Sequence, residues 1–115
     1  MTDIKFISNV NDILSALEKG KHNALTAIGS SAETHTKENI TADKLVDTGR
    51  LRNSISHTVD GEAVYIGSNV EYAPYVELGT SRAKAHHMLQ KAATEHTDEY
   101  KRLAKEAFYN AINNV

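Results

Sequence analysis

The pattern that most limits how this chain of 115 residues can fold is a hairpin signature near its middle. Apolar and polar residues alternate from Leu51 to Val59, which is typical of a strand with one buried face. Asp60-Gly61 follows, a dipeptide that favours a tight turn, and the alternation then resumes. We therefore predict an antiparallel β-hairpin with strands at about 51–59 and 62–67.

Helical periodicity flanks the hairpin on both sides. Apolar residues recur at intervals of three and four from Asn11 to about Glu33, which predicts a long N-terminal helix that Gly20 could bend. The polar stretch 34–46 predicts a loop. A second helical pattern predicts a long C-terminal helix over about 88–113.

A shorter element is indicated between the hairpin and the C-terminal helix. Pro74 suits the first turn of a helix, and Gly79 suits the position just past a helix end. This spacing predicts a short helix at about 73–78, followed by a polar loop at 80–87. The expected fold class is α+β with a small antiparallel sheet, and the length predicts a single domain over residues 1–115.

The composition excludes several classes of function. The net charge of -2 and the pI of about 6.3 argue against a broad phosphate-binding face. The absence of cysteine excludes disulfides, thiolate nucleophiles and cysteine-ligated zinc. No apolar run approaches the roughly 20 residues of a membrane span, and no secretory signal pattern opens the chain. We expect a protein of a cytoplasm or of something assembled there.

The histidines of the C-terminal half do not predict a metal site. A helical zinc site places two ligands four residues apart on one face, with a third group nearby. Lys91 lies four residues after His87, and Tyr100 lies four residues after His96. We therefore interpret His86, His87 and His96 as ordinary surface or half-buried side chains.

Glu77 is interpreted as a structural carboxylate. It lies between apolar neighbours, and no second acid–base group is evident beside it. It could accept hydrogen bonds from the Gly79–Thr80 backbone or pair with an arginine. We predict that Asp47, Thr48 and Gly49 form a tight turn with a positive φ at the glycine. This turn would position Arg50 as the ion-pair partner of Glu77, while Arg52 and Arg82 stay open as alternatives.

Two stretches resemble a known family. Residues 46–55 read VDTGRLRNSI, and residues 64–80 read VYIGSNVEYAPYVELGT. They are similar to the patterns D-T-G-x-L-R-x-S-I and V-x-I-G-[ST]-x-V-x-Y-A-x-Y-x-E-x-G-T of tail-completion, or head–tail joining, proteins of long-tailed bacteriophages and prophages. Relatives usually continue with a segment like Q-P-F-L-R-P-A, whereas residues 86–92 read HHMLQKA here. That departure predicts an earlier start or a different entry angle for the C-terminal helix.

The resemblance implies a virion structural protein of the neck or upper tail, without catalysis or a cofactor. Such proteins self-associate into rings, expected to hold six copies, and stay monomeric in isolation if a partner triggers assembly. Implied partners are connector or head-completion proteins and tail-tube or tail-terminator proteins, with no membrane and no specific nucleic acid. The expected location is the virion, and the host cytoplasm before assembly. The motif residues that become assembly candidates are Asp47, Thr48, Gly49, Arg50, Leu51, Arg52, Tyr72, Tyr75, Glu77, Gly79 and Arg82.

Two other functions stay open at this point. A small nucleic-acid-binding module would use Arg50, Arg52, Arg82 and Lys84 as a contiguous basic patch. A small metal-dependent hydrolase would instead use Glu77 with His86 or His87 in one pocket.

Overall fold

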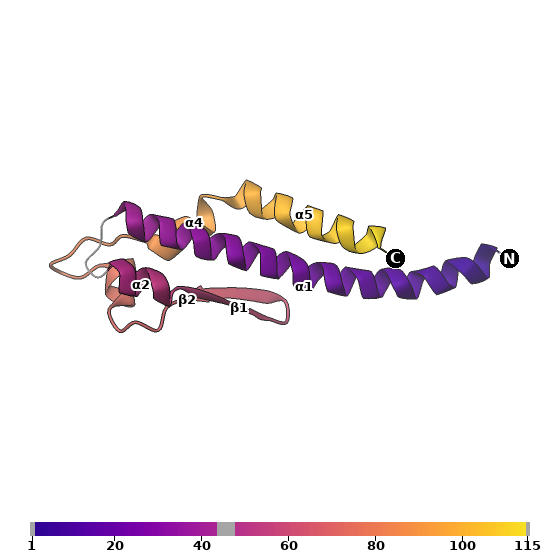
Figure 1. Ribbon diagram of the computed structural model, residues 1–115, viewed down its shortest axis with the longest axis horizontal. Helices are drawn as coiled ribbons and strands as arrows, with labels where there is room; N and C mark the ends of the chain where they lie inside the picture. Colours follow the sequence, from indigo (N-terminus) through magenta and orange to yellow (C-terminus); the bar gives the residue numbers. More distant parts are fainter. Residues whose placement is uncertain (1, 44–47, 115) are drawn as a thin grey trace.

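The computed structural model describes residues 2–43 and 48–114. Its longest element is helix α1, Thr2–Ala42, which runs through the middle of the molecule (Figure 1). The predicted N-terminal helix is therefore confirmed but extends at both ends. The prediction of a loop at 34–46 is wrong as far as Ala42, because α1 continues to that residue. Residues 44–47 lie outside the described residues.

Threonines that suggested a loop are accommodated inside α1. The hydroxyls of Thr34, Thr36 and Thr41 donate to the carbonyl oxygens four residues earlier, at 3.1, 2.8 and 3.0 Å. These bonds satisfy side chains that would otherwise compete with the helix backbone. Thr36 and Ile40 are both fully buried, so tertiary packing overrides the weak helix propensity of this stretch.

Gly20 and Gly29 neither end nor interrupt α1. Each lacks a Cβ atom and so lets a neighbouring element come close to the helix backbone. A Cβ atom on Gly20 would lie 2.8 Å from Cδ1 of Phe108. A Cβ atom on Gly29 would lie 2.7 Å from both Cδ2 of His57 and Cγ2 of Val64. Nine residues at roughly 100° each place the two glycines about 180° apart around the helix. The C-terminal helix therefore packs on one face of α1, and the hairpin packs on the other.

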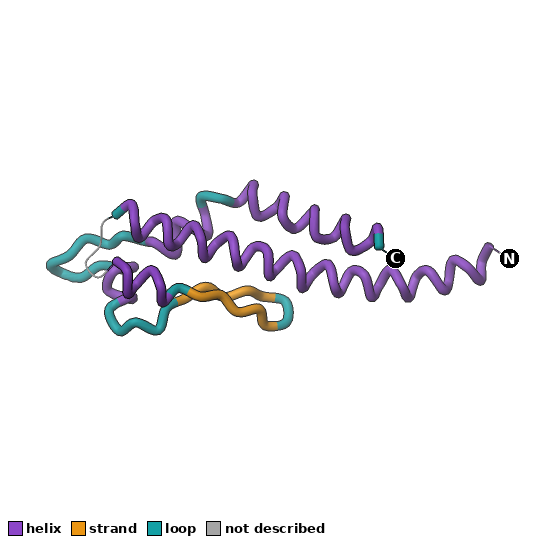
Figure 2. The backbone as a smooth tube through the Cα atoms, viewed as in Figure 1, coloured by secondary structure: helices purple, strands orange, loops and turns teal. Residues whose placement is uncertain are grey.

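The hairpin consists of β1, Ser56–Asp60, and β2, Ala63–Gly67. They pair antiparallel in a two-stranded sheet, with Val59 opposite Val64 across the predicted turn, where Gly61 has a φ of 60°. Figure 2 shows the pair as the strands of the described chain. The predicted hairpin and the α+β class are confirmed.

The predicted start of the first strand, at residue 51, is wrong, however. Residues 51–54 belong to helix α2, Thr48–Ser54. Leu51 and Ile55 are buried and Asn53 is exposed, so a spacing of four governs this stretch, and the predicted alternation begins only at the strand itself. Gly49 is helical, without the predicted positive φ, and Asp47 lies outside the described residues.

The short helix is confirmed as α3, Ala73–Leu78, with Pro74 in its first turn and Gly79 just past its end. The predicted loop at 80–87 is also present. The single C-terminal helix is instead two helices, α4, Met88–Thr94, and α5, Thr97–Asn113. Glu95 and His96 separate them, and the acidic residues Asp98 and Glu99 open α5, where they favour a helix start.

The molecule is an elongated rod of 72 × 23 × 22 Å. Helix α5 runs antiparallel to α1 on one side and the hairpin lies on the other, while α1 contacts α2, α4, α5 and both strands (Figure 1). The N-terminal turns of α1 project beyond the end of α5. In the described ranges, no helix combines the length and apolar character that a membrane span requires.

Candidate assembly site

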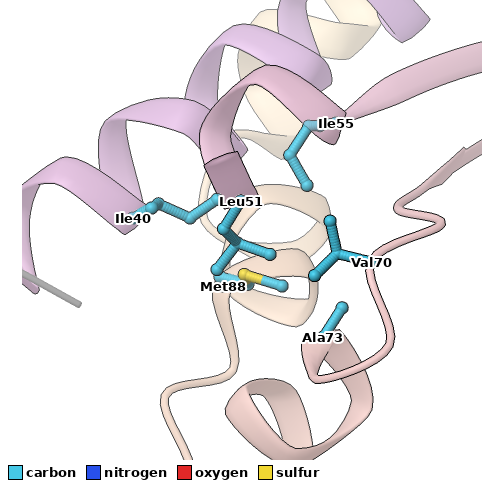
Figure 3. Close-up of a cluster of buried hydrophobic side chains, with 6 residues drawn as sticks. All are labelled: Ile40, Leu51, Ile55, Val70, Ala73 and Met88. Carbon is cyan, nitrogen blue, oxygen red and sulfur yellow. The ribbon is translucent and has the colours of Figure 1, made fainter. Parts of the chain in front are cut away.

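The first motif stretch supplies anchors of the main hydrophobic cluster. Leu51 and Ile55 project from α2 and its end toward Met88, which is fully buried at the start of α4 (Figure 3). The cluster thereby joins α1, α2, α3 and α4 at one end of the rod. Its buried members are Ile40, Leu51, Ile55, Val70, Ala73 and Met88.

Arg50 pairs with Glu71, in place of the predicted ion pair with Glu77. Nη2 of Arg50 lies 2.9 Å from Oε2 of Glu71, and the guanidinium carbon lies 5.4 Å from the ring centroid of Tyr72. A hydrogen bond from its own backbone N–H, followed by the one from Arg50, lowers the pKa of Glu71. Both charged side chains are more than half exposed, so this pair adds little to stability.

Glu77 is a structural carboxylate, as predicted, but it binds a helix terminus. Its two oxygens accept the backbone N–H groups of Leu89 and Gln90, at 2.8 and 3.0 Å. These N–H groups lie in the first turn of α4, where no carbonyl of the helix can reach them. A negative charge is also favoured at the N-terminus of a helix. Glu77 therefore ties α3 to α4.

Gly79 and Thr80 shape the loop between α3 and α4. Gly79 has a φ of 77°, and a Cβ atom there would lie 2.7 Å from the backbone nitrogen of Ala85. The hydroxyl of Thr80 accepts the N–H groups of Arg82 and Ala83, at 3.2 and 3.0 Å. The N–H of His86 returns to the carbonyl of Val76 at 2.9 Å. The second motif stretch thus builds a folded-back loop.

The cations of the nucleic-acid hypothesis have different surroundings. Arg50 is engaged by Glu71, and Nη1 of Arg52 donates to Oγ1 of Thr41 at 3.3 Å. Arg82 and Lys84 are exposed in the loop. A carboxylate therefore offsets the charge of Arg50, whereas the hydroxyl of Thr41 leaves the charge of Arg52 in place, so the nucleic-acid hypothesis loses one of its four cations.

The residues of the hydrolase hypothesis have other hydrogen-bond partners in the described chain. The carboxylate of Glu77 binds the N-terminus of α4, whereas Nδ1 of His86 lies 2.9 Å from Oδ2 of Asp43. His87 precedes α4 in the left-handed conformation, with a φ of 51°, and its backbone N–H donates to the carbonyl of Glu77. Both carboxylate oxygens of Glu77 are therefore engaged by the N-terminus of α4.

Large apolar side chains are exposed on α1, α3 and α5, and on β2, where Tyr65 is 61% exposed. Two groups of them lie far apart along the rod. The first, which we call the proximal apolar group, consists of Tyr75 and Leu78 on α3, at 62% and 72% exposure. The second, the distal apolar group, belongs to α1 and α5 at the other end of the rod, where residues 12–16 of α1 lie near residues 110–114 at the end of α5. Its members are Ile13, Leu14, Leu17, Tyr109 and Ile112. Leu14 lies roughly 120° around α1 from Gly20, which faces α5.

A cluster that the sequence patterns did not reveal joins α1 to the start of α5. Nε2 of His35 lies 2.6 Å from Oε2 of Glu99, and the rings of His35 and His96 stack with centroids 3.5 Å apart. Hydrogen bonds from His35 and then from Ser31 lower the pKa of Glu99, whereas burial, followed by the charge of Glu99, raises the pKa of Tyr100.

The reason it escaped prediction is physical. His35 lies in the stretch expected to be a loop, and zinc ligands on a helix were expected four residues apart. His96 and Glu99 are three residues apart, which also places two side chains on one helix face. That spacing was the available sequence signal for two of the three residues, His96 and Glu99.

Comparison with known proteins identifies the family. No curated protein matched the chain, and no solved structure matched it either. One family model, described as "Bacteriophage HK97-gp10, putative tail-component", matches residues 4–79. The match takes in α1 from residue 4 onward, α2, the hairpin and α3. It includes the whole first motif stretch and the second as far as Gly79. The chain therefore belongs to the HK97-gp10-like family of bacteriophage tail components.

Proposed function

We propose that this tail component completes the tail or joins it to the head, by assembling into a ring at the neck. The observation that supports this best is the pair of apolar groups at separate places on a long molecule. Leu14 and the core residue Ile40 are separated by about 40 Å along α1, at 1.5 Å per residue. Copies that associate head to tail use two different surfaces, and such contacts close into a ring when the rotation allows it.

In this proposal, the proximal apolar group of one copy contacts the distal apolar group of the next. The resemblance to tail-completion proteins favours six copies around the tail axis. The partners are then connector or head-completion proteins on one side and tail-tube or tail-terminator proteins on the other. The described sheet has two strands, so each strand also has an edge available for pairing with a neighbour. The role requires no catalysis.

Light scattering of the purified chain over a wide concentration range tests the proposal. We expect growth from monomer to one closed particle of uniform mass. Leu14→Lys and Leu78→Lys should each remain monomeric, because each places a charge on one side of the contact. Thr26→Lys, an exposed site midway along α1, is the control and should assemble normally.

Mixing the two variants distinguishes head-to-tail association from a symmetric dimer. Leu14→Lys keeps its proximal group and Leu78→Lys keeps its distal group, so an equimolar mixture should form a dimer of one copy of each and stop there. A chain that stays monomeric at every concentration, and that also fails to bind purified connectors and tail tubes, would contradict the proposal.

A further inference from the structure

His35, His96 and Glu99 form a group that fits a metal ion. His35 comes from α1, while His96 and Glu99 come from the start of α5. Their donor atoms all lie within 4.8 Å of one another. We infer that the three side chains bind a divalent transition metal of the zinc class, which clamps the α4–α5 turn onto α1. This inference is independent of the ring.

The ligand chemistry and spacing fit zinc. Two imidazoles and one carboxylate are ligands that Zn²⁺ accepts, with a water in the fourth position. Tetrahedral bonds of about 2.0–2.1 Å place ligand atoms about 3.3 Å apart. Nε2 of His35 lies 2.6 Å from Oε2 of Glu99, and Nδ1 of His96 lies 3.9 Å from the same oxygen. Both distances lie within an ångström of the required spacing.

Metal binding requires a small rearrangement, in which the 2.6 Å contact between His35 and Glu99 opens and one ring turns. The rings of His35 and His96 are stacked almost parallel, at 4°, and a metal lies close to the plane of each imidazole that binds it. One ring must therefore rotate. His96 can do so more easily, because it lies at the break between α4 and α5 and its side chain is 33% exposed, against 15% for His35.

The surroundings already support the ligands. Oγ of Ser31 donates to Oε1 of Glu99 at 2.8 Å, which leaves Oε2 facing the histidines. Nδ1 of His35 is buried without a hydrogen-bond partner, and Oε2 of Glu38 lies 3.8 Å from it. A carboxylate behind the second nitrogen of a ligating histidine is the usual arrangement in metal sites, because it fixes the ring and its tautomer. A small movement of Glu38 would complete that bond.

Titration of the untagged full chain with Zn²⁺, after removal of bound metal, tests the inference. We expect one ion per chain and a melting temperature that rises with Zn²⁺ concentration, because the ion binds the folded state. Co²⁺ should give the visible absorption of a tetrahedral site. His96→Ala and Glu99→Gln should each weaken Zn²⁺ binding by more than about 100-fold, and Glu38→Gln by about 10-fold as a supporting group.

His86→Ala is the matched control, because His86 also pairs with a carboxylate, that of Asp43, but belongs to no three-ligand group in the described chain. Its zinc affinity should equal that of the parent chain. Circular dichroism checks that each variant folds, and the titration of the parent chain decides the question if one does not. The inference is overturned if the parent chain shows no saturable binding, or if His96→Ala binds zinc as tightly as the parent.

Discussion

At the scale of single residues, Glu77 shows what the sequence could predict about the motif and what it could not. Its apolar neighbours predicted a carboxylate that holds backbone N–H groups or an arginine, and it holds N–H groups, although not those of Gly79 and Thr80. Its partner was not predictable, because the N–H groups of Leu89 and Gln90 become available only once α4 begins where it does. Arg50, the predicted partner, instead donates a hydrogen bond to Glu71, which lies just before α3.

The role of Glu77 can be tested by its effect on unfolding. Glu77→Ala should lower the free energy of unfolding by about 2 kcal/mol, because two N–H groups at the start of α4 lose a charged acceptor. Glu77→Gln should cost about 1 kcal/mol, since the amide oxygen can still accept one bond. Urea denaturation followed by circular dichroism measures both.

Glu95→Gln serves as the control for this pair. Glu95 is exposed between the C-terminus of α4, where a negative charge is unfavourable, and the N-terminus of α5, where it is favourable. The two effects offset, so its removal should leave stability nearly unchanged. If Glu95→Gln and Glu77→Gln lowered the free energy of unfolding equally, Glu77 would not be the cap of α4.

At the scale of elements, the sequence predicted which helices and strands exist better than where they end. The hairpin, α3 and the two long helical regions were found from periodicity and turn residues. The errors occur where tertiary contacts override local preference. Gly20 suggested a bend in α1, but Gly20 and Gly29 each give a neighbouring element the room to pack against the helix backbone.

Glycine-to-alanine substitutions separate packing from helix propensity. Alanine in a helix interior normally stabilises by about 1 kcal/mol relative to glycine. Gly29→Ala should instead destabilise by about 1–2 kcal/mol, because its Cβ atom would collide with His57 and Val64. The midpoint of urea unfolding measures the change.

Gly49→Ala supplies the comparison within the same chain. Gly49 is helical in α2, and a Cβ atom there would meet no atom within 4 Å. This variant should gain about 0.5–1 kcal/mol. If Gly29→Ala proved as stable as Gly49→Ala, the close packing of the hairpin on α1 would be refuted.

At the scale of the whole molecule, the sequence predicted the kind of protein but not its candidate sites. The motif stretches carried the family, whereas the zinc-type group depends on α5 folding back along α1. His35 and Glu99 are separated by 64 positions in the chain, so no local pattern could join them. The two apolar groups likewise become separate surfaces only through the length of α1.

The projecting end of α1 makes a prediction at this scale. Isolated helical turns without packing partners are marginal in water. Backbone amides of α1 before Asp12 should therefore exchange hydrogen much faster in the isolated chain than those between Ala24 and Ile40. Hydrogen–deuterium exchange with mass spectrometry measures this. Equal protection along α1 in a verified monomer would contradict it, and protection gained on assembly would place the contact there.

The shape of the rod also affects how the protein will behave in flow. A compact chain of this length has a radius of gyration of about 13 Å, whereas the value here is 18.9 Å. An elongated particle experiences more friction than a sphere of equal mass, so it diffuses slowly and leaves a gel-filtration column early. A column calibrated with round proteins would therefore overstate its mass and could report a dimer for what is a single rod.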